Sequence, residues 1–329
     1  MLSRVASSIY WMNRYIERAE NYARLIEVDY NLAMDLPPGL VQEQWRPLVL
    51  TTGDEELFQQ KYAEFTKKNV IRFLGFDTDN PNSICSCLFS ARENARTVRE
   101  IIPSEMWMQL NEMYLSARQV IKEENWSQKA LMQFFRDIKQ GSHLFSGIMD
   151  ATFSREEGWH FGNIGKFLER ADKTDRIIDM KYYYLLPNPD YVGTPLDLLQ
   201  WSALLKSASA FEMYRKSFGK LDVANIIKFL VFDREFPRAM RYCLIRAEES
   251  LHSIVGSEKF TFETRAEKEM GKLRSELDYT DVHDIFKFGL HEYLDQFQSK
   301  LNDVGGAIAQ TFFADTSVEK IVQQNAAGS

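Results

Sequence analysis

The stretch Tyr15-Ile16-Glu17-Arg18-Ala19-Glu20 recurs half a chain later as Phe167-Leu168-Glu169-Arg170-Ala171-Asp172 in this sequence of 329 residues. The same offset of 152 residues aligns Arg24 with Arg176. Matching apolar residues would show only that both segments need a core, whereas matching charges on a helix need a separate reason. The repetition predicts that two copies of one charged helix form the axis of the fold.

Apolar residues around the first copy follow a helical period. From Val5 to Ala33 they recur at alternating steps of four and three, which places them on one stripe of a long helix. Further segments of this kind follow, and no run alternates apolar and polar residues for long enough to demand a sheet. The sequence therefore predicts an all-α fold. In the first half, shorter helices are expected at residues 42–50, 55–65, 69–76, 104–122 and 126–153.

Three polar residues are expected to cap helices in the first half. Asp54 precedes the helix at 55–65, and Ser104 stands at the start of the helix at 104–122. Asn80 and Pro81 fit the N-cap and first-turn positions of a further helix, which is expected to end before a later proline.

A second alignment extends the repeat beyond the charged helix. An offset of 156 residues aligns 71–77 with 227–233, and Cys87 with Cys243. The offset changes by four residues near Pro37-Pro38, in a loop where insertions are tolerated. These matches favour a tandem duplication of one helical unit.

Two repeats of this length predict a helical bundle whose two pseudo-symmetric halves pack as one body. The first repeat is expected at residues 1–155 and the second at 156–314. A solenoid would need shorter units and more of them. Residues 315–329 have no counterpart in the first half and are expected to form a flexible tail.

The composition restricts the class of protein. A net charge of -7 disfavours a nucleic-acid partner, because nucleic-acid binders carry basic patches. No segment approaches the roughly 18 apolar residues of a membrane span, and the N-terminus lacks the apolar core of a signal peptide. The three cysteines fit buried thiols in a reducing compartment better than a disulfide framework. We expect a cytoplasmic protein that binds neither nucleic acid nor membrane.

Charged residues of both copies form the main candidate cluster. An exposed pair four residues apart, such as Glu20 and Arg24, contributes only about 0.2–0.5 kcal/mol, too little to explain its repetition. Two stronger explanations remain open. Buried ion pairs could lock helices together, with Glu17 or Glu169 meeting Arg92, Arg96 or Arg170, or the stripes could line a charged pocket for a cation, an amine or a partner's side chain. The full cluster comprises Glu17, Arg18, Glu20, Arg24, Arg92, Glu93, Glu169, Arg170, Asp172, Asp175, Arg176 and Glu249.

Two acidic residues in this cluster require separate interpretation. Asp175 occupies the apolar position that Ala23 holds in the first copy, so its carboxyl must find a partner or stay protonated. Glu249 and His252 have the Glu-x-x-His spacing of di-iron bundles. Arginine replaces the histidine at the corresponding position of the first half, where Glu93 is followed by Arg96. We therefore predict no metal site.

The remaining motifs point to structure more than to chemistry. Asp77 and Asp233 end corresponding Phe-Leu-x-Phe segments and are expected to order their loops. His283 and His291 are expected on neighbouring turns of one helix. The sequence has no phosphate-binding glycine loop, Gly-x-Ser-x-Gly elbow or His-Glu-x-x-His motif. No catalytic nucleophile is identified, no cofactor is expected, and the balance leans against an enzyme.

Several segments together resemble a known family. They lie at residues 2–6, 9–12, 14–21, 76–84, 91–96, 158–161 and 168–172. In these segments the chain resembles the bacterial alpha-E family, which is named for its helical content and its Glu-Arg motif, and the resemblance runs to about Phe313. It carries the motif over to Glu17-Arg18 and Glu169-Arg170 as positions of importance, and it implies no established activity.

The resemblance also implies partners. Members of the family are commonly encoded beside, and sometimes fused to, a circularly permuted ATP-grasp ligase and a transglutaminase-like peptidase. We therefore predict a non-catalytic accessory or binding protein of an amide- or peptide-forming pathway, which binds the ligase or its peptide through the charged stripes. The alternative is an enzyme with a carboxylate-lined, divalent-metal-dependent site between the halves. Assembly of the chain with itself also stays open.

Overall fold

The structure is a computed structural model that describes residues 1–35, 44–122, 126–185 and 193–314. These residues form helices joined by turns and contain no β-strand, which confirms the predicted all-α class. The longest helices are α1 (Ser3–Asp35) and α9 (Glu157–Leu185), which carry the two Glu-Arg stretches. The expected tail at 315–329 and the proline loop at Pro37-Pro38 lie outside the described residues.

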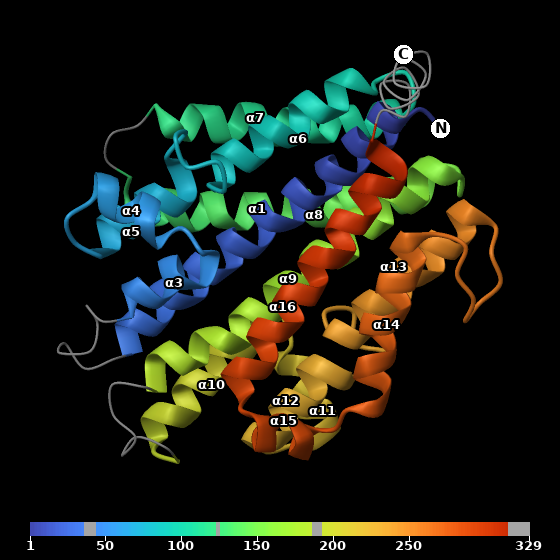
Figure 1. The fold of residues 1–329 in the computed structure, drawn as a ribbon. Helices are drawn as coiled ribbons and strands as arrows, with labels where there is room; N and C mark the ends of the chain where they lie inside the picture. Colours follow the sequence, from blue (N-terminus) through green and yellow to red (C-terminus); the bar gives the residue numbers. More distant parts are fainter. Residues whose placement is uncertain (36–43, 123–125, 186–192, 315–329) are drawn as a thin grey trace, which may run out of the picture.

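Helices α1 and α9 lie side by side and run in the same direction (Figure 1). Two contacts show this parallel direction. Tyr10 on α1 lies against Gly165 on α9, and one turn further along both helices Arg14 pairs with Glu169. The two backbones come close at Gly165, where an added Cβ would clash with the carbonyl oxygen of Tyr10. A side chain at this position would force the two helices apart.

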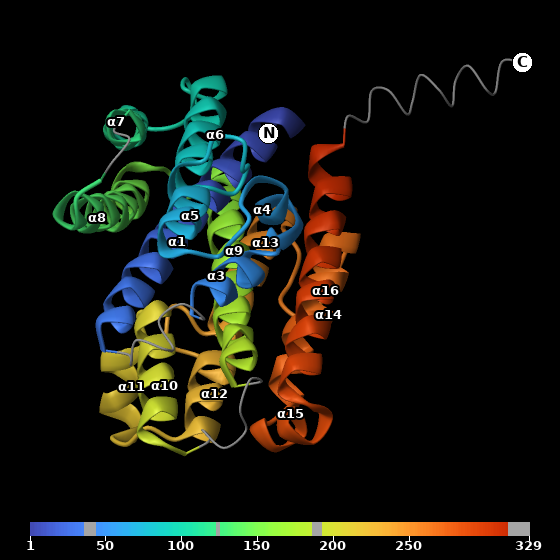
Figure 2. The same ribbon diagram turned by 90° about the vertical axis from the view of Figure 1, so that its left-hand side faces the viewer.

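Three helices pack on the α1 side of this pair. Helices α6 (Ile84–Thr97) and α8 (Gln128–Thr152) contact α1, and α7 (Ser104–Ile121) contacts both α6 and α8. Figure 2 shows α7 and α8 together at one side of the molecule, with α1, α6 and α9 in the middle. The amphipathic stripe predicted for residues 5–33 is thus covered from more than one side.

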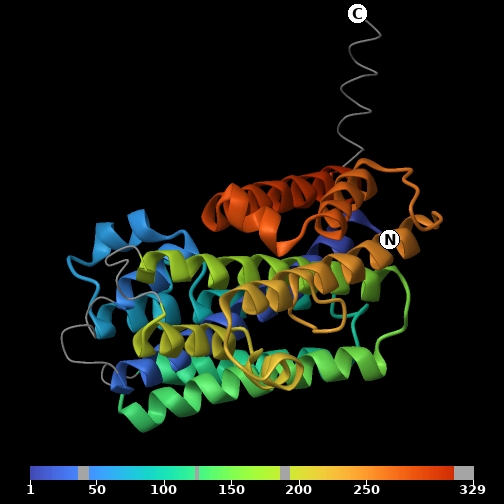
Figure 3. The ribbon, with the colours of Figure 1, turned by 90° about the horizontal axis from the view of Figure 1, so that it is seen from below.

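A second set of three helices packs on the α9 side. Helices α13 (Met240–Val255) and α16 (Leu290–Ile308) contact α9, and α14 (Arg265–Tyr279) contacts both α13 and α16. Seen from below (Figure 3), α14 and α16 form one outer layer and α8 lies at the opposite side, with α9 and α13 between them. Each long helix is therefore held by its own pair of neighbours.

Two short helices cross between the long ones. Helix α3 (Trp45–Thr52), which follows α1 in the sequence, packs on α9, whereas α10 (Pro195–Ser207), which follows α9, packs on α1. The two ends of the helix pair are therefore interlocked. The other short elements are α4 (Glu55–Lys61), α5 (Lys67–Ile71), η1 (Arg72–Phe76), α11 (Phe211–Phe218), α12 (Val223–Phe232), α15 (Val282–Phe288) and η3 (Ala309–Phe313).

Buried apolar side chains from both ends of the chain form one continuous core. The prediction of buried thiols is confirmed, since Cys85, Cys87 and Cys243 are all free and buried. Burial raises the pKa of each of these thiols to about 12, which keeps them protonated and unreactive at neutral pH. Among the described helices, none has the length and apolar character needed to cross a membrane.

The predicted helix caps differ from the observed ones. Asp54 makes no capping hydrogen bond, because its Oδ1 accepts from the side chain of Asn82 at 2.9 Å. Helix α6 is capped by Ser83 instead of Asn80, whose amide orders the preceding loop by bonding the carbonyl of Phe73 at 3.1 Å. Asp54 thus stands at the predicted N-cap position without a capping hydrogen bond, because a tertiary contact occupies its side chain. The prediction for Asn80 is wrong, because a contact near its own loop occupies that side chain.

Three other expectations also need correction. Ser104 is the first helical residue of α7 and not its cap, which is Pro103. The helix expected at 55–65 ends at Lys61. His283 lies on α15 and His291 on α16, because a break at Gly289, with φ of 112°, separates these helices.

Candidate functional site

The Glu-Arg dipeptides of α1 and α9 exchange partners across the helix pair. Arg170 donates from Nε and Nη2 to the two carboxylate oxygens of Glu17, at 2.7 and 2.8 Å. In return, Arg18 donates from Nε and Nη2 to the two oxygens of Glu169, at 2.6 and 3.0 Å. Glu17 is 3% exposed and Glu169 is fully buried. Each motif thus supplies the acid that pairs with the other motif's arginine, in the bidentate geometry that suits a guanidinium.

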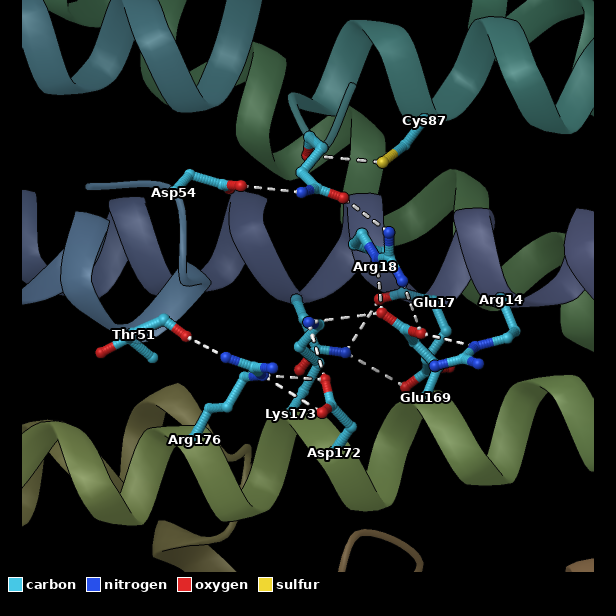
Figure 4. A network of polar contacts seen from close by, with 12 residues as sticks. Arg14, Glu17, Arg18, Thr51, Asp54, Cys87, Glu169, Asp172, Lys173 and Arg176 are labelled. Atoms are coloured by element: carbon cyan, nitrogen blue, oxygen red, sulfur yellow. Dashed lines mark hydrogen bonds and ion pairs between the residues drawn. The ribbon is translucent and has the colours of Figure 1, made fainter. Parts of the chain in front are cut away.

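Glu169 has two further cationic neighbours (Figure 4). Arg14, one turn before Arg18, donates to it at 2.8 Å, and the ammonium of Lys173 lies 3.4 Å away. Burial alone would raise the pKa of Glu169, but Arg18, Lys173 and Arg14 together hold that pKa well below its usual range. The carboxylate is therefore ionised in the folded protein.

Glu17 also has a second arginine, and it comes from a third part of the chain. Arg238, which precedes α13, donates to Glu17 and to Glu20, each at 3.0 Å. Glu20 is also paired with Arg24, four residues away. Burial would raise the pKa of both carboxyls, but the neighbouring guanidinium groups lower the pKa of Glu17 and of Glu20. The α13 side is thus tied directly to α1.

Two arginines connect the network to the short crossing helices. Arg24 donates from Nε to the carbonyl oxygen of Ser207, the last residue of α10, at 2.6 Å. Arg176 donates from Nη1 to the carbonyl oxygen of Thr51 in the last turn of α3, at 3.1 Å (Figure 4). Asp172 accepts from Arg176 at 3.1 Å. Cations at helix C-termini satisfy carbonyls that the helix leaves unpaired.

Asp175 differs from the other acids of the cluster. Its Oδ2 accepts from Gln298 on α16 at 3.0 Å, whereas its fully buried Oδ1 has no hydrogen-bond partner among the described residues. Burial, together with the nearby Asp172, raises the pKa of Asp175 well above its usual range. Burial thus disfavours the charged form of this carboxyl, as expected for an acid in an apolar position.

Three predicted cluster residues lie outside this network. Arg92 pairs with Glu93 at 2.9 Å, and Glu249 pairs with Arg246 at 2.7 Å. Of the three arginines expected to meet Glu17 or Glu169, only Arg170 does so, since Arg92 and Arg96 both pair with Glu93 on their own helix. The structure therefore separates the predicted cluster into a buried network and two local surface groups.

The two loop carboxylates act within their own loops. Asp77 accepts from the backbone N–H of Asp79 at 3.0 Å and lies 3.1 Å from the ammonium of Lys61. Asp233 accepts from two backbone N–H groups, two and three residues further on, at 2.8 and 2.7 Å. Both therefore order the turn that follows them.

Sequence reasoning missed Arg14, Lys173 and Arg238 as members of the network. Helical spacing could have found two of them, because Arg14 precedes Arg18 by four residues and Lys173 follows Glu169 by four. No spacing rule points from α1 to Arg238. Within the described residues, no group of three or more histidine, cysteine or acidic side chains is placed to hold a metal ion.

The fold and the network define an all-α protein organised around a buried exchange of Glu-Arg partners. Residues 1–313 match the Alpha-E family, described as a predicted alpha-helical domain with a conserved ER motif, and the chain belongs to this family. Glu-Arg occurs at two places in the sequence, residues 17–18 and 169–170, which are the two dipeptides that exchange partners.

Similar curated proteins are known from mycobacteria. The chain is 22% identical over 332 residues to an uncharacterized protein of Mycobacterium bovis and to uncharacterized proteins of two Mycobacterium tuberculosis strains. Each alignment covers 94% of this chain and 37% of the relative, so the chain spans little more than a third of the length of these relatives. No solved structure matches the chain significantly.

Proposed function

We propose that this chain is a non-catalytic accessory protein of an amide- or peptide-forming pathway that contains a circularly permuted ATP-grasp ligase and a transglutaminase-like peptidase. A non-catalytic role is supported by the pairing of Glu17 with Arg170 and of Glu169 with Arg18. A general base needs a pKa near the working pH. A carboxylate held ionised by guanidinium groups is a weak base, so this pairing suits a structural task. The family resemblance supports the pathway.

The partly exposed arginines of the network offer a partner protein a surface to contact. The carboxylates are buried, but Arg14, Arg18 and Arg170 keep 17, 15 and 14% of their side chains exposed. An acidic group of the ligase or of its peptide can meet these guanidinium edges without breaking the internal pairs. The network would then both hold α1 against α9 and present guanidinium edges to a partner.

Co-purification with the neighbouring ligase tests this function. We expect the tagged chain to retain the ligase, or to change the rate of amide formation, and the effect to weaken in Arg14→Gln. Arg46→Gln is the matched control, because Arg46 also pairs with a glutamate, at 3.0 Å, but lies outside the network. Absence of both a complex and any effect on ligation would overturn the proposal. Size-exclusion chromatography of the chain alone tests self-assembly in the same preparation.

We also infer that the chain arose by duplication of one helical unit, with repeats at residues 1–155 and 156–314. The backbone contacts of Arg24 and Arg176 support this inference, since their acceptors, Ser207 and Thr51, are themselves 156 residues apart. Superposition of α1, α6 and α8 on α9, α13 and α16 in an experimental structure is the test. A rotation far from 180° would contradict it.

One observation favours a second candidate, an enzyme with a carboxylate-lined site between the halves. Asp175 is a buried acid with an unpartnered oxygen, and Asp172 lies near it. A carboxyl whose pKa is raised by burial can serve as a proton donor. Elemental analysis of the native protein, with turnover assays of Asp175→Asn, decides between the candidates. Metal at stoichiometric level, or activity lost in a variant that stays folded, would favour the enzyme.

A further inference from the structure

A pocket of about 500 Å³ lies between the first turns of α9 and the C-terminal half of α13. Its volume is in the range of small-molecule sites. The aromatic rings of Trp159 and Phe167 form part of its wall, and Arg246 and Glu249 form another part. The pocket includes none of the carboxylates that form the buried network between α1 and α9.

Two buried polar side chains in this pocket lack partners. Asn163 is 2% exposed and Ser250 is 4% exposed, and both line the pocket. Neither side chain makes a hydrogen bond to any residue that the structure describes. Two neighbouring side chains of the lining, Trp159 and His160, each have a buried ring nitrogen with no hydrogen-bond partner among the described residues, whereas more than nine in ten buried polar groups in proteins are paired. An amide and a hydroxyl are thus available to a ligand at the pocket wall.

At the two corresponding positions of the first half, the side chains make contacts within the protein. Trp11, 152 residues before Asn163, fills its position with an indole that packs 5.1 Å from the guanidinium of Arg14. Asn94, 156 residues before Ser250, donates to the carbonyl of Ser90 at 2.8 Å. The second half therefore has open polar groups where the first half has protein contacts.

Charges at the pocket favour an anion. Glu249 is shared between Arg246 at 2.7 Å and Lys259 at 3.6 Å, so these three groups together carry one positive charge. Burial and the nearby Arg155 lower the pKa of His160, which keeps that imidazole neutral at physiological pH. A donor-rich, net positive wall suits an oxyanion.

A hydrolytic triad does not explain these residues. Ser257 lies 2.8 Å from Nδ1 of His252, and Glu267 lies 3.2 Å from the same nitrogen. A serine nucleophile and its orienting acid must use opposite nitrogens of the imidazole. Glu267 is also the capping-box residue of α14, bonded to Thr264. The pocket geometry thus points to binding and not to acyl transfer.

We propose that this pocket binds a small organic carboxylate of the size of an N-acylated amino acid or the last residue of a peptide. Arg246, Asn163 and Ser250 take the carboxylate, and an apolar side chain packs against Trp159 and Phe167. The carboxylate is favoured over a bare inorganic anion because the aromatic wall needs an apolar partner. The inference uses only this pocket and does not depend on the proposed pathway.

Isothermal titration of the purified chain with N-acetyl-L-phenylalanine tests the proposal. We expect saturable binding, and binding at least about tenfold weaker for the neutral amide of the same compound, because the amide cannot form a charge-assisted hydrogen bond to Arg246. Arg246→Ala should weaken binding by a similar factor. Arg96→Ala is the matched control, since both arginines form exposed pairs with a glutamate three residues away, at 2.7 and 2.8 Å.

A second variant addresses the buried wall. Asn163→Leu should abolish binding while circular dichroism shows an unchanged helical signal, and inorganic phosphate should bind more weakly than the acid. No saturable heat, equal affinity for acid and amide, equal loss in Arg96→Ala, or tighter binding of phosphate would each overturn the proposal. Arg246 is 45% exposed, so its variant tests the pocket even if Asn163→Leu does not fold.

Discussion

Glu17 on α1 accepts two hydrogen bonds from Arg170 on α9, so the acid of one Glu-Arg dipeptide pairs with the arginine of the other. Arg18 and Glu169 repeat the arrangement in reverse. Moving two charges out of water is costly, and a buried pair often adds little net stability over an apolar one. Breaking it, however, leaves a charge uncompensated. The exchange therefore favours one register of α1 against α9, because a slip along the helices would break both exchanged pairs.

The close approach at Gly165 yields the first prediction. Gly165→Ala should destabilise the protein by about 1–3 kcal/mol, because its Cβ would push against the Tyr10 carbonyl in a packed interface. Gly147→Ala on α8 is the control, since nothing lies within 4 Å of the added Cβ. It should be neutral or stabilise by up to about 1 kcal/mol through helix propensity. Urea unfolding of both variants measures the difference, and equal effects would contradict the close approach.

Asp175 predicts a dependence of stability on pH. Its folded pKa lies above the usual value of 3.8, so the folded state binds more protons than the unfolded state above that pH. Stability is then lost as pH rises from about 4 towards the folded pKa, by up to about 1.4 kcal/mol per unit. Asp175→Asn removes this contribution. The free energy of unfolding of the variant minus that of the wild type should rise between pH 4 and 8, and a flat difference would show that the carboxyl is ionised.

The lowered pKa of Glu169 predicts the opposite dependence of stability on pH. Its folded pKa lies well below the usual 4.5, so its contribution is complete above about pH 4.5 and is lost as pH falls through that range. Glu169→Gln should cost about 3–5 kcal/mol at pH 7, because three cations lose their anion, and the cost should shrink below pH 4. Glu269→Gln, at an exposed pair with Lys272, should cost at most about 1 kcal/mol. Chemical denaturation from pH 7 to 3 measures both.

Local sequence patterns predicted the helices better than they predicted the partners of the charged residues. The spacing from Val5 to Ala33 was sufficient for α1, since helical period depends on near neighbours. The pair of Glu17 with Arg170 spans 153 residues, and no local rule selects one arginine among several at that distance. The capping hydrogen bonds expected from Asp54 and Asn80 are absent for the same reason, because a tertiary contact and a loop contact occupy these side chains, although Asp54 does stand at the N-cap of α4.

The burial of Asp175 illustrates where sequence reasoning was sufficient. Its place on the apolar stripe followed from its alignment with Ala23, and burial is what raises its pKa. Its partner Gln298, which lies on α16, could not be predicted, because the packing of α16 against α9 is not encoded in either helix alone.

A double-mutant cycle on Glu17 and Arg170 tests the central claim, which is that the exchanged Glu-Arg pairs lock α1 to α9. Unfolding free energies of Glu17→Gln, Arg170→Met and the double variant would be measured at pH 7. Arg238 keeps Glu20 as a partner in the double variant, so the cycle isolates the exchanged pair. We expect each single change to cost about 3–5 kcal/mol and the pair to be coupled by more than about 1 kcal/mol. Additive costs, or single variants as stable as the wild type, would contradict the lock.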